Sequence, residues 1–189
     1  MKRIFYGLVF GCVLVAGAEE KASVTAPVNL VKNASFEEGV KFWDRRVRAG
    51  KNGEKPAIDF TIVEEGVTDK SSARINSPKG GGLAIAEFSQ LIPVKPDCEY
   101  YASLDVKVLR PGSWQAAYIE HRNAARSQIA FTPFTMTPEV KKLPAGQWRK
   151  QECRFKTKPD QRFVSVSLRL QHLGAGEVLY DNIKLVEVK

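Results

Sequence analysis

Aromatic, amide and charged side chains recur at two-residue spacing in two parts of the chain. Trp114, Tyr118 and Glu120 share one parity, so they would lie on one face of a β-strand. Arg169 and Gln171 would project from the outer side of a second strand, whose other side is apolar. Aromatic rings pack against the C–H face of a sugar ring, and planar polar groups bind its hydroxyls. These residue types therefore form a candidate carbohydrate-binding set.

Each candidate also has a purely structural interpretation. Sandwich proteins bury aromatic residues, so Trp114 and Tyr118 are equally consistent with core positions. Arg169 and Gln171 are also consistent with simple solvation of an outer face. Tyr101, which points away from the apolar parity of its own strand, completes the candidate set.

Catalytic chemistry has little support in the sequence. His121 and His172 are the only histidines, and neither belongs to a metal-binding or nucleophile motif. The carboxylates are scattered and form no recognisable acid/base pair of the kind that glycosidases use. We therefore expect a protein that is not an enzyme, with both histidines structural or solvated.

The strands that would carry these residues are indicated by an apolar period of two. Residues 58–62, 100–108 and 164–170 alternate between apolar and polar types, as half-buried strands do. Glycine and proline clusters separate the runs, and no amphipathic helix longer than a turn or two is evident. Many short strands between turns predict an all-β fold, a jelly-roll β-sandwich.

The first 18 residues have the three parts of a secretory signal. A basic start at residues 1–3 precedes an apolar stretch at 4–15, and small residues follow at 16–18. We expect cleavage after Ala18, a loose lead over 19–28 and one domain over 29–189. The mature protein is then secreted, periplasmic or at the cell surface. It has no further apolar run of the roughly 20 residues that a membrane span needs, and we expect a monomer.

The formal net charge of +8 makes acidic partners plausible. The basic residues are scattered without a long block, and nucleic acid is a poor candidate outside the cytoplasm. An acidic glycan suits the expected compartment better, although the charge is equally consistent with a role in solubility.

Two cysteines follow the expected cleavage point. Cys98 shares parity with Tyr100 and Cys153 shares parity with Phe155, so both sulfurs should face the core. We predict a disulfide between them, and the alternative is two buried free thiols that pack as small apolar groups.

Read in order, segments spread over residues 29–188 resemble the carbohydrate-binding modules of the family 4, 9 and 22 type. The segments are Asn29-Leu30-Val31-Lys32-Asn33-Ala34-Ser35-Phe36-Glu37 with Trp43, Gln90-Leu91-Ile92-Pro93-Val94-Lys95-Pro96 with Tyr100, Trp148 with Phe155-Lys156-Thr157, and Gly176-Glu177-Val178-Leu179-Tyr180-Asp181-Asn182-Ile183-Lys184-Leu185. Residues 110–145 match least. The resemblance implies a galactose-binding-like jelly roll whose concave sheet face often holds a glycan.

The resemblance also implies a structural calcium ion that joins the N-terminal segment to the final strand. Glu37 and Asp181 fall on the matching positions. Asp181 has the parity of Leu179, Ile183 and Leu185, which would turn its carboxylate toward the interior, where it needs a partner. The alternative is that Asp181 accepts hydrogen bonds from backbone amides or pairs with a basic residue.

Three functions remain open at this point. The first is a secreted, non-catalytic protein that binds carbohydrate on an exposed sheet face. The second is a structural or adhesive envelope protein that uses the sandwich for protein–protein contact. The third, a small glycan-active enzyme, would need two carboxylates facing each other across a cleft at roughly 5 to 9 Å.

Overall fold

The computed structural model describes residues 27–49, 53, 57–79, 84–111, 114–135, 144–171 and 175–188. The predicted leader, with its cleavage point at Ala18, and His172 lie outside these residues. Within them the chain forms strands β1 (Asp44–Arg48), β2 (Asp59–Val63), β3 (Ser72–Ser77), β4 (Ile85–Pro93), β5 (Glu99–Arg110), β6 (Trp114–Asn123), β7 (Gln128–Thr135), β8 (Trp148–Lys156), β9 (Gln161–Gln171) and β10 (Gly176–Val188).

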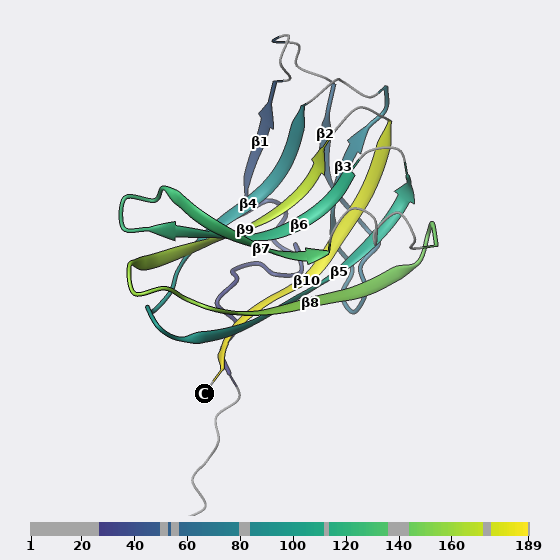
Figure 1. The fold of residues 1–189 in the computed structure, drawn as a ribbon. Coiled ribbons are helices and arrows are strands. Elements are labelled where there is room, and N and C mark those ends of the chain that lie inside the picture. The colour runs from purple at the N-terminus through teal and green to yellow at the C-terminus, as the bar shows by residue number, and fades with distance from the viewer. Residues whose placement is uncertain are drawn as a thin grey trace, which may run out of the picture.

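The strands make two five-stranded antiparallel sheets. One has the order β1-β4-β9-β6-β7, and we call it the β9 sheet after its central strand. The other has the order β2-β3-β10-β5-β8, and we call it the β10 sheet. Figure 1 shows them as two stacked layers. β2-β3 and β6-β7 are consecutive in the chain, whereas the other six neighbouring pairs of these described strands are not, as in a jelly roll. The predicted all-β sandwich is confirmed.

The core lies between the sheets and follows the predicted period of two. In β5, Tyr100, Ala102 and Leu104 are at most 1% exposed, and the intervening Tyr101 is more exposed. In β9 the residues of even number from 164 to 170 are at most 3% exposed. Burial of these apolar side chains is the main stabilising contribution to such a sandwich.

The N-terminal segment is attached to β10 through one asparagine. The Asn29 side chain donates to the Ile183 carbonyl at 3.0 Å and accepts from the Leu185 amide at 2.9 Å. Nearby, Phe36 is fully buried and its ring centroid lies 5.0 Å from that of Trp43. These contacts explain the spacing of the opening segment that carries the family resemblance.

A β-bulge in β10 changes the predicted orientation of Asp181. Asp181 pairs with Asp105, but Lys184 pairs with Ser103, so β10 has one extra residue here. The bulge is at Asn182, whose φ of 50° is in the left-handed region that asparagine tolerates. Asp181 therefore lies on the opposite face of the β10 sheet from Ile183, so the prediction that the two residues share a face is wrong.

The two cysteines are free thiols, so the predicted disulfide between Cys98 and Cys153 is wrong. Both pack against the core, as their parity predicted. However, Cys153 pairs with Ala102, and the Cys98 carbonyl accepts from the Thr157 amide at 3.0 Å. The cysteines are thus four residues apart along β5, about 13 Å at the rise of a strand. A disulfide requires Cα atoms within about 7 Å.

Candidate functional site

The outward face of the β9 sheet collects polar side chains in rows that cross the strands. One row joins Arg46 of β1, Glu87 of β4 and Arg169 of β9, because their backbones are paired in register. Two rows further along the same face, Ser165 of β9 pairs with Glu120 of β6. Side chains in one row point to the same side of the sheet, so four strands contribute to one surface.

Two buried carboxylates on this face are bridged by one guanidinium. Glu87 and Glu120 are 2% and 3% exposed. Arg169 donates from Nε to Oε2 of Glu87 at 2.9 Å and from Nη2 to Oε1 of Glu120. Ser167 donates its hydroxyl to Glu87 at 2.9 Å, and Arg122 donates to the other oxygen of Glu120. Buried charges need such partners, and these two have them.

The network holds Glu87 ionised. Burial raises the pKa of the Glu87 carboxyl, but the charges of Arg169 and Arg48 and the hydrogen bonds from Ser167 and Arg169 together lower it more. The net pKa lies below the ordinary value. Glu87 therefore carries its negative charge at neutral pH.

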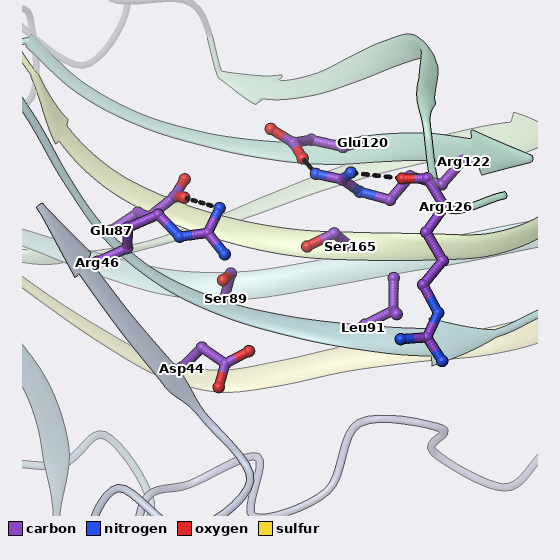
Figure 2. Close-up of a pocket in the computed structure, with 9 residues that line it drawn as sticks. All are labelled: Asp44, Arg46, Glu87, Ser89, Leu91, Glu120, Arg122, Arg126 and Ser165. Carbon is purple, nitrogen blue, oxygen red and sulfur yellow. Dashed lines mark hydrogen bonds and ion pairs between the residues drawn. The ribbon is translucent and has the colours of Figure 1, made fainter. Parts of the chain in front are cut away.

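A pocket of about 240 Å³ opens over this network (Figure 2). Arg46 and Arg126 lie on opposite sides of it, with Ser89, Leu91 and Ser165 between them. Its full lining is Asp44, Arg46, Glu87, Ser89, Leu91, Glu120, Arg122, Arg126 and Ser165. The floor is thus carboxylate and hydroxyl, and arginines stand on two sides.

A second pocket of about 170 Å³ adjoins the first and shares Glu120 with it. The Tyr118 ring stands edge-on to that of Phe131, with centroids 5.6 Å apart. The Arg169 guanidinium lies 5.2 Å from the Tyr118 centroid, and Gln171 donates to the Tyr118 hydroxyl at 3.3 Å. Phe131 is 57% exposed, so an aromatic ring reaches solvent beside planar polar groups.

The structure brings most of the predicted ligand-binding residues together. Tyr118, Glu120, Arg169 and Gln171 line the second pocket, and the shared face predicted for Tyr118 and Glu120 is correct. Trp114 pairs with Gln171 through the backbone, but its side chain is outside the described part of the chain.

Two expectations about these residues need correction. Tyr101 lies on β5 of the other sheet, where it donates its hydroxyl to Glu152 at 2.6 Å, so it is not part of this surface. Arg169 has the predicted outward orientation, but its side chain is 14% exposed and ion-paired with Glu87 and Glu120. Arg169 supports the surface more than it presents a free charge.

Sequence reasoning missed Arg46, Arg122, Arg126, Glu87 and Phe131. Arg46 and Arg48 do alternate along a short strand, which is a period-two signal with charged residues in place of apolar ones. Phe131 lies within residues 110–145, where the family resemblance is poorest. The meeting of Glu87 with Arg169 depends on strand order, which a single sequence does not reveal.

Glu37 and Asp181 both hold the loop 64–71. Glu37 accepts from the Ser71 amide at 2.6 Å and Asp181 from the Val67 amide at 2.8 Å. The other Asp181 oxygen accepts from the Asn182 amide at 2.7 Å. Burial raises the pKa of Asp181, and the amide hydrogen bonds offset part of that rise.

The carboxylate oxygens beside this loop do not by themselves form a calcium site. Calcium takes six to eight oxygen ligands, and the Glu37 and Asp181 oxygens that face the loop bind amide hydrogens. Within the described ranges no group of three or more acidic, histidine or cysteine side chains is placed to hold a metal. The hydrogen-bonding alternative for Asp181 is therefore present, and calcium stays a prediction from the resemblance.

His121 is buried, and each of its ring nitrogens has a side-chain partner. It is 6% exposed, and its ring nitrogens lie 3.1 Å from Gln161 Oε1 and 2.9 Å from Thr132 Oγ1. Burial lowers the pKa of His121, and the Gln161 hydrogen bond offsets part of that effect.

In the part of the chain that the structure covers, no helix has the length and apolar character needed to cross a membrane.

Comparison with known proteins identifies this architecture. No protein-family model and no curated protein sequence matches the chain. The family 16 carbohydrate-binding module-2 matches 84% of this chain and 100% of its own, with a TM-score of 0.57 and 19% identity. TmCBM61 in complex with β-1,4-galactotriose matches 85% of this chain and 99% of its own, with a TM-score of 0.55 and 14% identity.

A further match is a larger protein. The enzymatically active domain of bacteriophage CBA120 tailspike protein 4 matches 85% of this chain with a TM-score of 0.64 and 15% identity. The chain spans about a fifth of that protein, because the match covers 21% of it. Modules of families 4, 11 and 22 also match most of the chain. The fold is the jelly-roll sandwich of carbohydrate-binding modules, as the resemblance predicted.

Proposed function

We propose that this protein is a secreted, monomeric, non-catalytic carbohydrate-binding protein that holds a polysaccharide or glycoconjugate on the outward face of the β9 sheet. The observation that carries the proposal is the pair of adjoining pockets that share Glu120. They place an exposed ring, Phe131, beside the guanidinium and amide groups of Arg169 and Gln171. This is the combination that sugar recognition requires. The matches to carbohydrate-binding modules support it through the fold.

The charge of the face supports an acidic glycan. Of the residues that the structure describes, five arginines and three carboxylates lie on it: Arg46, Arg48, Arg122, Arg126 and Arg169, with Asp44, Glu87 and Glu120. Glu87 and Glu120 are already paired with Arg169 within the sheet. Arg46, whose exposed side chain also reaches Glu87 at 3.8 Å, and Arg126 border the pocket opening. A uronate or sulfate group fits the excess of positive charge.

The state of the carboxylates supports the non-catalytic part of the proposal. A glycosidase general acid needs a raised pKa, and the pKa of Glu87 is lowered. Glu120 accepts hydrogen bonds from Arg122 and Arg169, so both buried carboxylates already have arginine partners within the sheet. A sheet face without exposed aromatic side chains would have favoured the structural or adhesive alternative, but Phe131 is exposed on this one.

Calorimetric titration tests the proposal. Polygalacturonate, alginate, chondroitin sulfate and neutral xylan are titrated into the protein at low and at high salt. We expect binding of an anionic polymer that weakens as salt rises, and no new reducing ends after long incubation. Equal binding of xylan at both salt levels would remove the acidic preference. A wild-type protein that binds none of the four polymers would contradict carbohydrate binding.

A further inference from the structure

Phe42 has a strained backbone and an exposed aromatic side chain, and neither feature stabilises the fold. Its φ is 70°, in the left-handed region that is costly for an aromatic residue, and its side chain is 47% exposed. The neighbouring backbone is fixed, because Asn33 donates to the Lys41 carbonyl at 3.1 Å. On the other side, Trp43 is buried and donates its amide to the Val40 carbonyl at 3.0 Å. The turn thus presents a large apolar ring to solvent at a cost in backbone strain.

Two lysines accompany the ring. Lys32 Nζ lies 5.3 Å and Lys41 Nζ 5.1 Å from the Phe42 centroid. The Lys32 backbone is held to β4, since it donates to and accepts from the Gln90 side chain at 2.8 and 2.9 Å. Lys41 pairs with Glu38. The described residues give Lys32 no ion pair, so its ammonium group is available to an anion.

Phe42 lines a third hollow, which adjoins the central pocket. This pocket of about 280 Å³ shares Asp44 and Leu91 with the central pocket. The central pocket in turn shares Glu120 with the pocket of Tyr118. The three hollows therefore adjoin one another, with an exposed phenylalanine in each outer one, Phe42 and Phe131. We call the three together the groove.

We propose that Phe42 and Lys32 form a terminal subsite of this groove, and that the whole groove takes a linear anionic polysaccharide that crosses the strands. The two phenylalanine rings stack on sugar rings at the ends, and Lys32 takes a carboxylate or sulfate group beside Phe42. Arg46 and Arg126 take such groups over the central pocket. The proposal rests on carbohydrate binding by the β9 sheet and adds a chain-length requirement. A short oligosaccharide fills the central pocket alone, and a long one also reaches Phe42.

The test uses Phe42→Gly in the full chain, because glycine accepts the left-handed backbone and removes the ring. Asp97→Gly is the matched control, since Asp97 has a φ of 57° and is exposed in the turn before β5. The anionic polymer that binds, whether polygalacturonate, alginate or chondroitin sulfate, supplies oligosaccharides of increasing length for titration. The comparison of these polymers also separates carboxylate from sulfate recognition.

We expect Phe42→Gly to weaken binding of the long oligosaccharides about 3- to 10-fold and to leave binding of the shortest ones unchanged. Its Tm should stay close to that of the wild type, because relief of the left-handed backbone strain opposes the extra freedom that glycine gives the unfolded chain. Asp97→Gly should leave all affinities unchanged. Lys32→Gln should reduce the salt dependence for the long oligosaccharides.

Two results would overturn the subsite and leave the proposed function intact. One is equal affinity of Phe42→Gly and wild type for long oligosaccharides. The other is an equal loss for short and long ones, which would indicate a general change of the sheet face. Binding of neutral xylan but of no anionic polymer would overturn the anionic class. A wild-type protein that binds no polysaccharide would instead contradict the proposed function itself.

Discussion

Arg169 on β9 donates a hydrogen bond from Nε to Oε2 of Glu87 on β4, at 2.9 Å, in a part of the surface where both side chains are largely buried. The same guanidinium binds Glu120 on β6. One side chain on the central strand thereby neutralises a carboxylate on each neighbouring strand. The floor of the groove is a charged network built into the sheet, and ligand contacts are left to its borders.

Arg169→Ala should destabilise the fold. The change leaves two buried carboxylates without their shared partner, although Arg48 and Arg122 remain near them. We expect a loss of about 2 kcal/mol in the free energy of unfolding, which corresponds to a fall in Tm of about 4 to 8 °C. Thermal unfolding followed by circular dichroism measures it.

Arg46→Ala is the matched control for that experiment. Its side chain is 54% exposed and lies 3.8 Å from Glu87, so its loss should change the free energy of unfolding by less than about 0.5 kcal/mol. It should weaken binding of an anionic polymer. Equal Tm values for the two variants would contradict the supporting role of Arg169.

The lowered pKa of Glu87 predicts a loss of stability in acid. A carboxyl whose pKa is lower in the folded than in the unfolded protein contributes stability above the unfolded value, near 4.5, and loses it as pH falls through the folded value. Glu87→Gln removes this titration. We expect its Tm to depend less on pH than that of the wild type below about pH 4.5. Parallel pH profiles for the two proteins would show that Glu87 is not held ionised.

Much of the sandwich was predictable because local pattern determines it. Alternating residues from Tyr100 to Val108 indicated a strand with one buried face, and burial follows that alternation. The orientation of Asp181 was not predictable, since one extra residue at Asn182 reverses the parity that follows it. A bulge has no reliable signature in a single sequence.

Residues of the groove were predictable by type but not by partner. Parity placed Tyr118 and Glu120 on one face, and it gave Arg169 its outward orientation. It did not reveal that Glu87 lies beside Arg169, because that contact depends on the strand order β4-β9-β6. The exposed fraction of an outward side chain depends on such neighbours. The sequence therefore indicated a more exposed Arg169 than the structure has.

Titration of thiols tests the register of β5 and β8. A chain without residues 1–18, unfolded in the absence of reductant, should show two reactive thiols, Cys98 and Cys153. In the folded protein Cys153 should react slowly, because burial raises its pKa to about 12 and little thiolate is present at neutral pH.

Cys98→Ala is the control for that titration. It should leave one reactive thiol. A wild-type chain with no reactive thiol, together with one thiol in Cys98→Ala, would show that the cysteines are bridged and that the register of these strands is different.

The last prediction concerns the loop 64–71 and separates hydrogen bonding from calcium binding. Asp181→Ala removes the acceptor of the Val67 and Asn182 amides from a fully buried position. We expect a loss of about 2 kcal/mol in the free energy of unfolding. Asp181→Asn should lose less at neutral pH, because it keeps one acceptor oxygen and avoids burial of a charge.

A chelator then distinguishes the two roles of Asp181. If amide hydrogen bonds alone hold the loop, the Tm of the wild type is the same in EDTA and in calcium, and the cost of Asp181→Ala is the same in both. Bound calcium would lower the Tm on addition of EDTA, and added calcium would restore it. The Tm difference between EDTA and added calcium should disappear in Asp181→Ala and in Glu37→Gln, since both carboxylates would be calcium ligands. A calcium effect that persists in both variants would place the ion elsewhere and leave Glu37 and Asp181 as hydrogen-bonding residues.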